Sequence, residues 1–289
     1  MNIARVFVIS LLAVLPAKAG ADLPKRSLAA AKLLPTGTSR ALIVAGLPGD
    51  DAHEEEFAGI VKEWRTWLTD ALGFPAAEVR VLFGKEPRNG TGKPASKDAV
   101  EREISQLKQI LKPNDRLWVF FLGHANYDGD HAYFHLPGRD LSEQELGKLL
   151  GDLPCREQVF WMTTPASGWF MKALSAKGRI VITATVADDE YNETEFPRAL
   201  VTVSKRPRAQ LDANHDGAVS ILELYNQVVA EVNERFAKDK RVPTEHAQLD
   251  DNGDGIGTEQ PASDKPDGGK KPADGALAGK TFLPLKRPG

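Results

Sequence analysis

The sequence contains a single cysteine, Cys155, among its 289 residues. No intramolecular disulfide can form, so the folded chain must depend on its apolar core and on any metal that it binds, although exported proteins often add disulfides to a small core. Cys155 comes shortly before the apolar run VFWM, residues 159–162. We expect a buried, unreactive thiol there, with a reactive nucleophile as the alternative.

The sequence also lacks an excess of charge of either sign. Its net charge is −3, its isoelectric point is about 6.1, and no long block of like charges occurs along its body. Binding to nucleic acid usually requires a basic patch or domain, so no nucleic-acid partner is expected. After the amino-terminal region, no stretch is apolar enough to predict an integral membrane segment.

The first 21 residues have the layout of a secretory signal peptide. MNIAR carries one arginine, residues 6–16 are apolar, and AKAGA supplies small residues for cleavage. The alternative is a membrane anchor, but the apolar run is well short of the roughly 20 residues that a spanning helix needs. We therefore expect an exported protein, periplasmic or extracellular, with residues 22–39 as a linker.

Apolar runs and amphipathic segments alternate through the body of the chain. Buried strands are predicted at residues 40–47, 78–84, 115–125, 156–164 and 179–186, and helices at residues 50–73, 96–112, 141–153 and 168–178. Residues 196–204 fit a helix or a strand. This order predicts an α/β fold with a mostly parallel sheet and helices on both faces.

In such a sheet, functional sites lie beyond the carboxyl ends of the strands. One predicted strand runs into His124, and the next runs into a loop of small residues, 163–168. A histidine and a small-residue loop at neighbouring strand ends are typical of a hydrolase in which a thiolate attacks a carbonyl with the help of the histidine.

Three segments resemble the caspase-like clan, and most closely the bacterial legumain-like cysteine peptidases. FFLGHANYDGD, 120–130, resembles the strand that ends in the catalytic histidine. WMTTPASGWF, 161–170, resembles the strand that ends in the nucleophile motif, and TATVADDEYNETEF, 183–196, resembles the strand and loop that shape the substrate pocket. The resemblance covers roughly residues 40–260. It implies a caspase/legumain-like α/β domain at residues 40–204.

The resemblance places His124 at the catalytic base position and Pro165 at the position of the nucleophilic cysteine. Proline has no nucleophilic group, and Ala125 stands where the family has glycine after the histidine. The sequence therefore predicts a peptidase scaffold that has lost its nucleophile.

Three other readings stay open around this predicted site. The hydroxyls of Ser167 or Thr164 can replace the thiol as a weak nucleophile. A metal can be held by a group of polar residues that follow one another closely: His124, Asp128, Asp130, His131 and His135. Acids of a predicted peptide pocket, Asp188, Asp189 and Glu190, favour a basic or amide side chain, unless they form only a solvated acidic loop.

A calcium-loop motif lies downstream, in LDANHDGAVSILEL. The EF-hand pattern D-x-[DN]-x-[DN]-G followed by five residues and Glu is filled without a mismatch. Side-chain oxygens, one backbone carbonyl and a carboxylate from the next helix are the ligands that Ca²⁺ takes in such loops. The predicted ligands are Asp212, Asn214, Asp216, Ala218 (through its carbonyl), Ser220 (directly or through water) and Glu223.

A second segment, LDDNGDGIGTE, repeats the motif in part. Asp250, Asn252 and Asp254 match, but the twelfth position carries no acid and Glu259 is only the tenth residue. It is a possible second metal loop. We expect the calcium-loop and helix segment, residues 205–260 with a long helix at 220–239, to pack on the α/β domain.

The remaining residues, 261–289, form a tail of low complexity, and we expect them to be disordered, although ALAGKTFLPL within the tail is apolar enough to dock back. The predicted function is an exported, calcium-binding pseudopeptidase that binds a peptide or protein partner without cleavage. The alternatives are an active endopeptidase with a displaced hydroxyl or a metal, and a structural, calcium-stabilised envelope protein.

Overall fold

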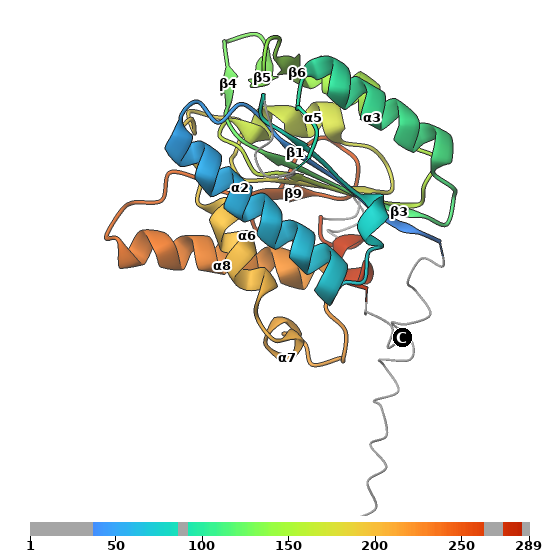
Figure 1. Ribbon diagram of the computed structural model, residues 1–289. Helices are drawn as coiled ribbons and strands as arrows, with labels where there is room; N and C mark the ends of the chain where they lie inside the picture. Colours follow the sequence, from blue (N-terminus) through green and yellow to red (C-terminus); the bar gives the residue numbers. More distant parts are fainter. Residues whose placement is uncertain (1–36, 86–91, 263–273, 285–289) are drawn as a thin grey trace, which may run out of the picture.

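The structure is a computed structural model that describes residues 37–85, 92–262 and 274–284 (Figure 1). The predicted signal peptide, residues 1–21, and most of the predicted linker lie outside the described residues.

A six-stranded sheet forms the centre of the molecule. Its order is β2 (Val79–Phe83), β1 (Ser39–Ala45), β3 (Arg116–Leu122), β7 (Glu157–Met162), β8 (Arg179–Thr183) and β9 (Gln248–Asp250). All neighbours pair in parallel except β9, which runs antiparallel to β8. The α/β fold with a mostly parallel sheet is therefore confirmed.

Helices cover both faces of this sheet, as predicted. One face carries α2 (Asp51–Thr66), α6 (Phe196–Ser204) and α8 (Ile221–Lys238); the other carries α3 (Lys97–Ile110), α4 (Glu143–Leu150) and α5 (Met171–Leu174) (Figure 1). The segment 196–204 is a helix, which begins with proline at its first turn.

Alternate residues of the central strands fill two separate cores. On the α2 side, Phe120 stacks on Trp161 with ring centroids 6.0 Å apart and packs against Trp64. On the α3 side, Phe121 packs edge-on against Phe134. Because strands β3 and β7 are buried on both faces, their sequences are continuously apolar rather than alternating.

A small antiparallel sheet follows β3 directly. It contains β4 (Ala125–Tyr127), β5 (Ala132–Phe134) and β6 (Leu141–Ser142). This sheet lies above the carboxyl end of the main sheet in Figure 1. Its residue Tyr127 stacks on Trp169, which follows the predicted nucleophile position.

The carboxyl-terminal part of the described chain differs from the predicted disordered tail. Residues 274–284 pack against the body, with Ala278 and Leu283 in the core on the α8 side. They contain one turn of 3₁₀ helix, η5 (Ala278–Lys280). The prediction of disorder is therefore wrong for these residues, because their apolar side chains find a place beside α8. Residues 263–273 and 285–289 lie outside the described ranges.

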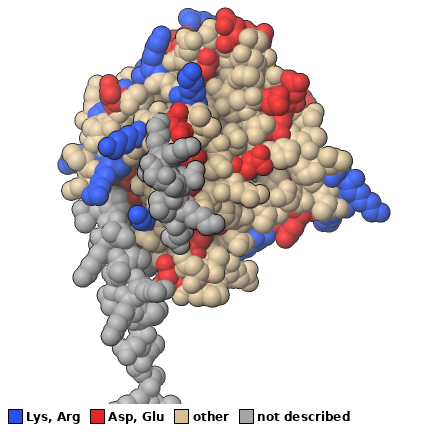
Figure 2. Space-filling view, turned by 180° about the vertical axis from the view of Figure 1, so that it is seen from behind, with Lys and Arg blue, Asp and Glu red and all other residues tan. Residues whose placement is uncertain are grey.

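Charged side chains of both signs are spread over the face of the molecule in Figure 2, with no large area of one sign. None of the helices within the described residues combines the length and the apolar character needed to cross a membrane.

Candidate functional site

His124 lies beyond the end of β3, next to the loop that follows β1. Its Nε2 atom donates a hydrogen bond to the carbonyl oxygen of Pro48 at 2.9 Å. The two strand exits approach closely at Gly46 and Gly123, where a Cβ on Gly123 would lie 3.3 Å from the Gly46 nitrogen. His124 therefore occupies the point where the chain order of the sheet reverses, between β1 and β3.

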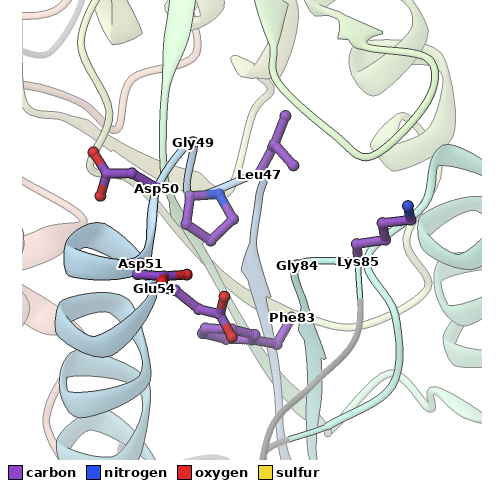
Figure 3. Close-up of a pocket in the computed structure, with 9 residues that line it drawn as sticks. Leu47, Gly49, Asp50, Asp51, Glu54, Phe83, Gly84 and Lys85 are labelled. Atoms are coloured by element: carbon purple, nitrogen blue, oxygen red, sulfur yellow. The ribbon is translucent and has the colours of Figure 1, made fainter.

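A cavity of about 410 Å³ opens beside this point, at the carboxyl ends of β1 and β2 (Figure 3). The loop after β1, the first turn of α2 and the end of β2 line it, with Asp51, Glu54 and Lys85 as its charged residues outside the N-cap of α2. Gly49 forms part of its wall toward His124, since a Cβ there would lie 3.9 Å from Nε2.

A second histidine, His53 in the first turn of α2, packs edge-on against His124 with ring centroids 5.2 Å apart. The carboxylate of Asp50 lies 2.8 Å from its Nδ1 atom, and that of Glu193 lies 3.5 Å from Nε2. The hydrogen bond to Asp50 raises the pKa of His53. Sequence reasoning missed this residue, although an acid three residues before a histidine at a helix start was a usable signal.

The strand exit that the sequence resemblance predicts as the nucleophile position is closed to solvent. Every residue from Thr163 to Gly168 is buried, including Pro165 at the predicted nucleophile position. Ala166 has a φ angle of 52°, in the left-handed region that costs energy for a residue with a Cβ. The backbone turns sharply here, but no nucleophilic side chain is presented at the turn.

The Ser167 hydroxyl is fully buried and committed to the fold. Its Oγ atom accepts hydrogen bonds from the backbone nitrogens of Ala184 and Thr185, both at 3.0 Å, and lies 3.1 Å from the Thr185 hydroxyl. Thr164 is also completely buried, and its hydroxyl has no hydrogen-bond partner among the residues that the structure describes. Neither hydroxyl contacts His124 through a hydrogen bond in the described structure, so the candidate nucleophiles and the candidate base are not brought together.

The predicted cluster of metal-binding histidines does not converge either. His131 contacts Glu143 at 3.0 Å, and His135 contacts the Asn126 side chain at 2.7 Å. Cys155 is buried, and burial raises the pKa of its thiol to about 12. These groups act as local structural contacts.

The three acids of the predicted peptide pocket differ in their surroundings. The carboxylate of Glu190 points inward and accepts hydrogen bonds from the backbone nitrogens of Val186, at 2.9 Å, and His246, at 3.0 Å. Asp188 and Asp189 are exposed. Only these two present their charge to solvent, while Glu190 holds the loop to the segment that follows α8.

The first predicted calcium loop has the backbone conformation that its motif requires. His215 and Gly217 have positive φ angles of 57° and 87°. The nitrogen of Gly217 donates to Asp212 Oδ2 at 2.9 Å, and that of Asp216 donates to Asn214 Oδ1 at 2.9 Å. The Asp216 side chain accepts from the Ala218 nitrogen at 2.9 Å. The side chains at all three alternate positions therefore accept backbone amides of the loop itself.

Glu223 folds back over this loop from the first turn of α8. Its Oε1 atom accepts from the backbone nitrogens of Ala213, at 3.0 Å, and Asn214, at 3.3 Å. Its Oε2 atom accepts from the nitrogen and the hydroxyl of Ser220, both at 2.8 Å. The carboxylate that the motif places at position 12 thus closes the loop.

The second loop repeats the backbone of the first. Gly253 and Gly255 have φ angles of 78° and 79°, at the positions equivalent to His215 and Gly217. The hydrogen bonds are equivalent too. The nitrogen of Gly255 donates to Asp250 Oδ2 at 3.0 Å, and that of Asp254 donates to Asn252 Oδ1 at 2.9 Å. Glu259, the acid predicted to complete this loop, is exposed.

Asp274 is the acid that the structure places near the second loop instead. It is buried, and its carboxylate accepts from the backbone nitrogen of Asp251 at 3.2 Å. Burial and the charges of Asp250, Asp251 and Asp254 raise the pKa of Asp274 to about 7. Sequence reasoning missed this residue because it lies in the segment that was expected to be disordered.

Segment 274–284 connects the two loops. Asp251, the second residue of the second loop, accepts backbone hydrogen bonds from Gly275, Leu277 and Ala278 at 2.7–2.9 Å. Further along, the nitrogen of Leu283 donates to the carbonyl of Val219 in the first loop at 2.8 Å. Val219, the apolar residue of the first loop, is therefore hydrogen-bonded to the extended end of segment 274–284.

As the side chains lie, no group of three His, Cys, Asp or Glu residues within the described ranges is arranged around a common point where a metal ion would fit. The loop carboxylates accept backbone amides, and cation binding would exchange some of these amides for the ion. The donor set of the first loop, with three carboxylates, one amide oxygen and the Ala218 carbonyl, nevertheless fits Ca²⁺, which prefers oxygen ligands.

Comparison with known proteins gives little further information. No protein-family model matches the chain, and no curated protein matches it. Among solved structures, the protein GSU0716 from Geobacter sulfurreducens is 16% identical, with a TM-score of 0.44, over 74% of this chain and 93% of that one. This neighbour assigns neither a family nor a function.

Proposed function

We propose that this chain is an exported, calcium-binding pseudopeptidase: a scaffold similar to the caspase-like clan and to legumain-like peptidases that binds a peptide or a protein partner without cleaving it. The observation that carries the proposal is the closed strand exit, where Pro165 stands at the nucleophile position and Ser167 Oγ is buried under two backbone donors.

Cleavage of a peptide bond at this site would need an exposed nucleophile within reach of a base. His124 retains its place at the end of β3, but its Nε2 atom is committed to Pro48. The Ser167 hydroxyl would have to release the amides of Ala184 and Thr185. The Ala184 amide would keep the Met162 carbonyl, but the loss of the acceptor for the buried Thr185 amide costs about 1–3 kcal/mol. Binding without chemistry is therefore the better match to the geometry.

The calcium part of the proposal is supported by the two equivalent loops. The donor oxygens are those that Ca²⁺ prefers, and the loop backbones already hold the sharp turns. Because both loops contact residues 274–284, we expect the metal to stabilise this end of the domain rather than to open a groove, as paired sensor hands do.

A peptide-cleavage assay tests the absence of catalysis. The purified protein, with and without millimolar Ca²⁺, is incubated with a library of peptides that vary at the residue before the cleaved bond. We expect no turnover. His124→Ala and Ser167→Ala are the matched variants. We expect Ser167→Ala to lower the free energy of unfolding by about 1–3 kcal/mol, because the buried Thr185 amide loses its acceptor, while the Ala184 amide keeps the Met162 carbonyl. Turnover that either variant abolishes would show an active peptidase instead.

The second calcium loop provides a test that separates two candidate ligands. Asp274→Asn should weaken or remove the second Ca²⁺ equivalent in a calorimetric titration, because the buried carboxylate next to Asp250 and Asp254 is lost. Glu259→Gln, at the exposed acid favoured by sequence alone, should leave the titration unchanged. The reverse result would assign the ligand to Glu259, and a single equivalent in every variant would leave only the first loop as a metal site.

A further inference from the structure

Two aromatic side chains form a stack beside the closed strand exit. The rings of Tyr127, at the end of β4, and Trp169, in the 3₁₀ turn η4 (Ser167–Phe170), lie parallel, with centroids 3.8 Å apart and planes 5° from one another. Both rings are partly exposed. A third aromatic residue, Tyr191, is 44% exposed and lies in the loop after β8. We call these three residues the aromatic platform.

Backbone contacts hold the segments of the aromatic platform together. The nitrogen of Ala166 donates to the carbonyl of Glu190 at 3.0 Å, directly before Tyr191. Gly168 lies so close to the loop that a Cβ on it would be 2.2 Å from the carbonyl carbon of Val186. The Tyr127 hydroxyl is fixed as well, since it donates to the Gly129 carbonyl at 2.9 Å. The backbone segments that carry the platform and the Tyr127 side chain are therefore held in place, which reduces the freedom that they lose when a ligand binds.

Negative charge borders the aromatic platform on two sides. Asp188 and Asp189 precede Tyr191, whose hydroxyl interacts with the Asp189 carboxylate and lies within electrostatic range of Tyr127. Asp130 lies in the turn after Tyr127, with its side chain 90% exposed. The basic residue nearest in sequence, Lys172, lies against Gly255 of the second calcium loop. The surface thus combines aromatic rings that are at least partly exposed with exposed carboxylates, of which Asp130 also lies 3.7 Å from His131 Nε2.

Such a combination attracts cations. A guanidinium or ammonium group within about 6 Å of an aromatic ring is attracted by the negative face of the ring, with tryptophan the strongest partner. An exposed carboxylate adds a charge-assisted hydrogen bond. Arginine gains more than lysine, because its planar group also stacks on rings.

We propose that the aromatic platform binds an arginine or lysine side chain of a peptide, with the alkyl stem on the rings of Trp169 and Tyr191 and the charge against Asp188 and Asp189. The inference rests on the proposed peptide-binding function and names the class of ligand. It also gives a role to the strand exit at residues 163–168, which offers no nucleophile. The residues around this exit recognise a side chain of the peptide and do not cleave the peptide.

Tryptophan fluorescence gives a specific readout, because Trp169 is partly exposed and the other four tryptophans are buried. Blocked pentapeptides carry arginine, lysine, citrulline or norleucine at their centre in an alanine background. We expect arginine and lysine peptides to bind about tenfold more tightly than their neutral counterparts, equivalent to roughly 1.4 kcal/mol. The fluorescence change should disappear in Trp169→Phe.

Two variants of exposed residues guard against loss of folding: Tyr191→Leu, and the double substitution Asp188→Asn with Asp189→Asn. Each should reduce the preference for the cationic peptide to about threefold or less, while Asp239→Asn, at an exposed acid after α8, should leave it unchanged.

Equal binding of arginine and citrulline peptides, or a preference that survives these variants, would overturn the platform while the proposed peptide-binding function stands. Failure of every peptide to bind, charged or neutral, would overturn both, and the calcium part would then depend on the thermal measurements alone.

Discussion

Millimolar Ca²⁺ is expected to raise the melting temperature of this protein by about 5–10 °C, and Glu223→Gln is expected to abolish that increase. A site with a dissociation constant on the order of 10 μM, occupied at one hundred times that concentration, stabilises the folded state by about 2.7 kcal/mol. For a chain of this size, each kcal/mol shifts the melting temperature by about 2–4 °C. Glu223 is central because its carboxylate both closes the loop and starts α8.

The measurement is a thermal melt at several Ca²⁺ concentrations, followed by circular dichroism. Because Glu223 also caps α8, its replacement lowers the melting temperature without metal, so the decisive quantity is the increment that Ca²⁺ adds. Glu234→Gln is the matched control, an exposed acid on the same helix. A Ca²⁺ increment that persists in Glu223→Gln would show that the first loop is not the site.

Glu245→Gln is expected to stabilise the protein at alkaline pH by about 2–4 kcal/mol and to have little effect near pH 4. Glu245 is 4% exposed and lies in the segment between α8 and β9. One carboxylate oxygen accepts from the Glu195 nitrogen at 2.8 Å, and the other has no hydrogen-bond partner within residues 37–85, 92–262 and 274–284. Burial, and secondarily the charges of Glu195 and Glu190, raise the pKa of Glu245 to about 8.

The sign follows from proton binding. Between the unfolded pKa, about 4.3, and the folded pKa of about 8, the folded state keeps a proton on Glu245 that the unfolded state has released. Stability therefore falls as pH rises through this window. Glutamine cannot ionise and keeps an acceptor for the Glu195 nitrogen. Urea unfolding at pH 5 and pH 8.5 measures the difference, with Glu234→Gln as the exposed control. An equal effect at both pH values would show that Glu245 is not held protonated.

Most of the sheet could be predicted from sequence because its strands are buried on both faces. The continuous apolar run of β3 marks a central parallel strand, and the helices between strands carry clear caps, such as Ser96 before α3. The antiparallel edge strand β9 was missed. It has only three residues, and its partner β8 is separated from it in sequence by α6 and α8.

The strand ends beside the candidate site were predictable, and their surroundings were less so. Motif and strand order predicted that His124 and Pro165 follow strands, and both come just after the carboxyl ends of parallel strands; their role as a site stays a prediction. Sequence could not show that Ser167 Oγ is covered by the amides at 184 and 185, because those donors come from another strand exit. Sequence could not predict the contact between the rings of His53 and His124 either, because the two residues follow different strands.

The pairing of Val219 with Leu283 has a consequence for the order in which the protein is made. Residues 212–223 leave the ribosome well before residues 281–283, with a delay on the order of seconds at 5–20 residues per second. During that delay the Val219 carbonyl of the first calcium loop lacks its donor, the Leu283 nitrogen. The Arg116 guanidinium likewise lacks its acceptor, the Phe282 carbonyl, which is 166 residues away in sequence. The contacts between the first calcium loop and residues 281–283 therefore form late, after all the parallel strands of the main sheet have been synthesised.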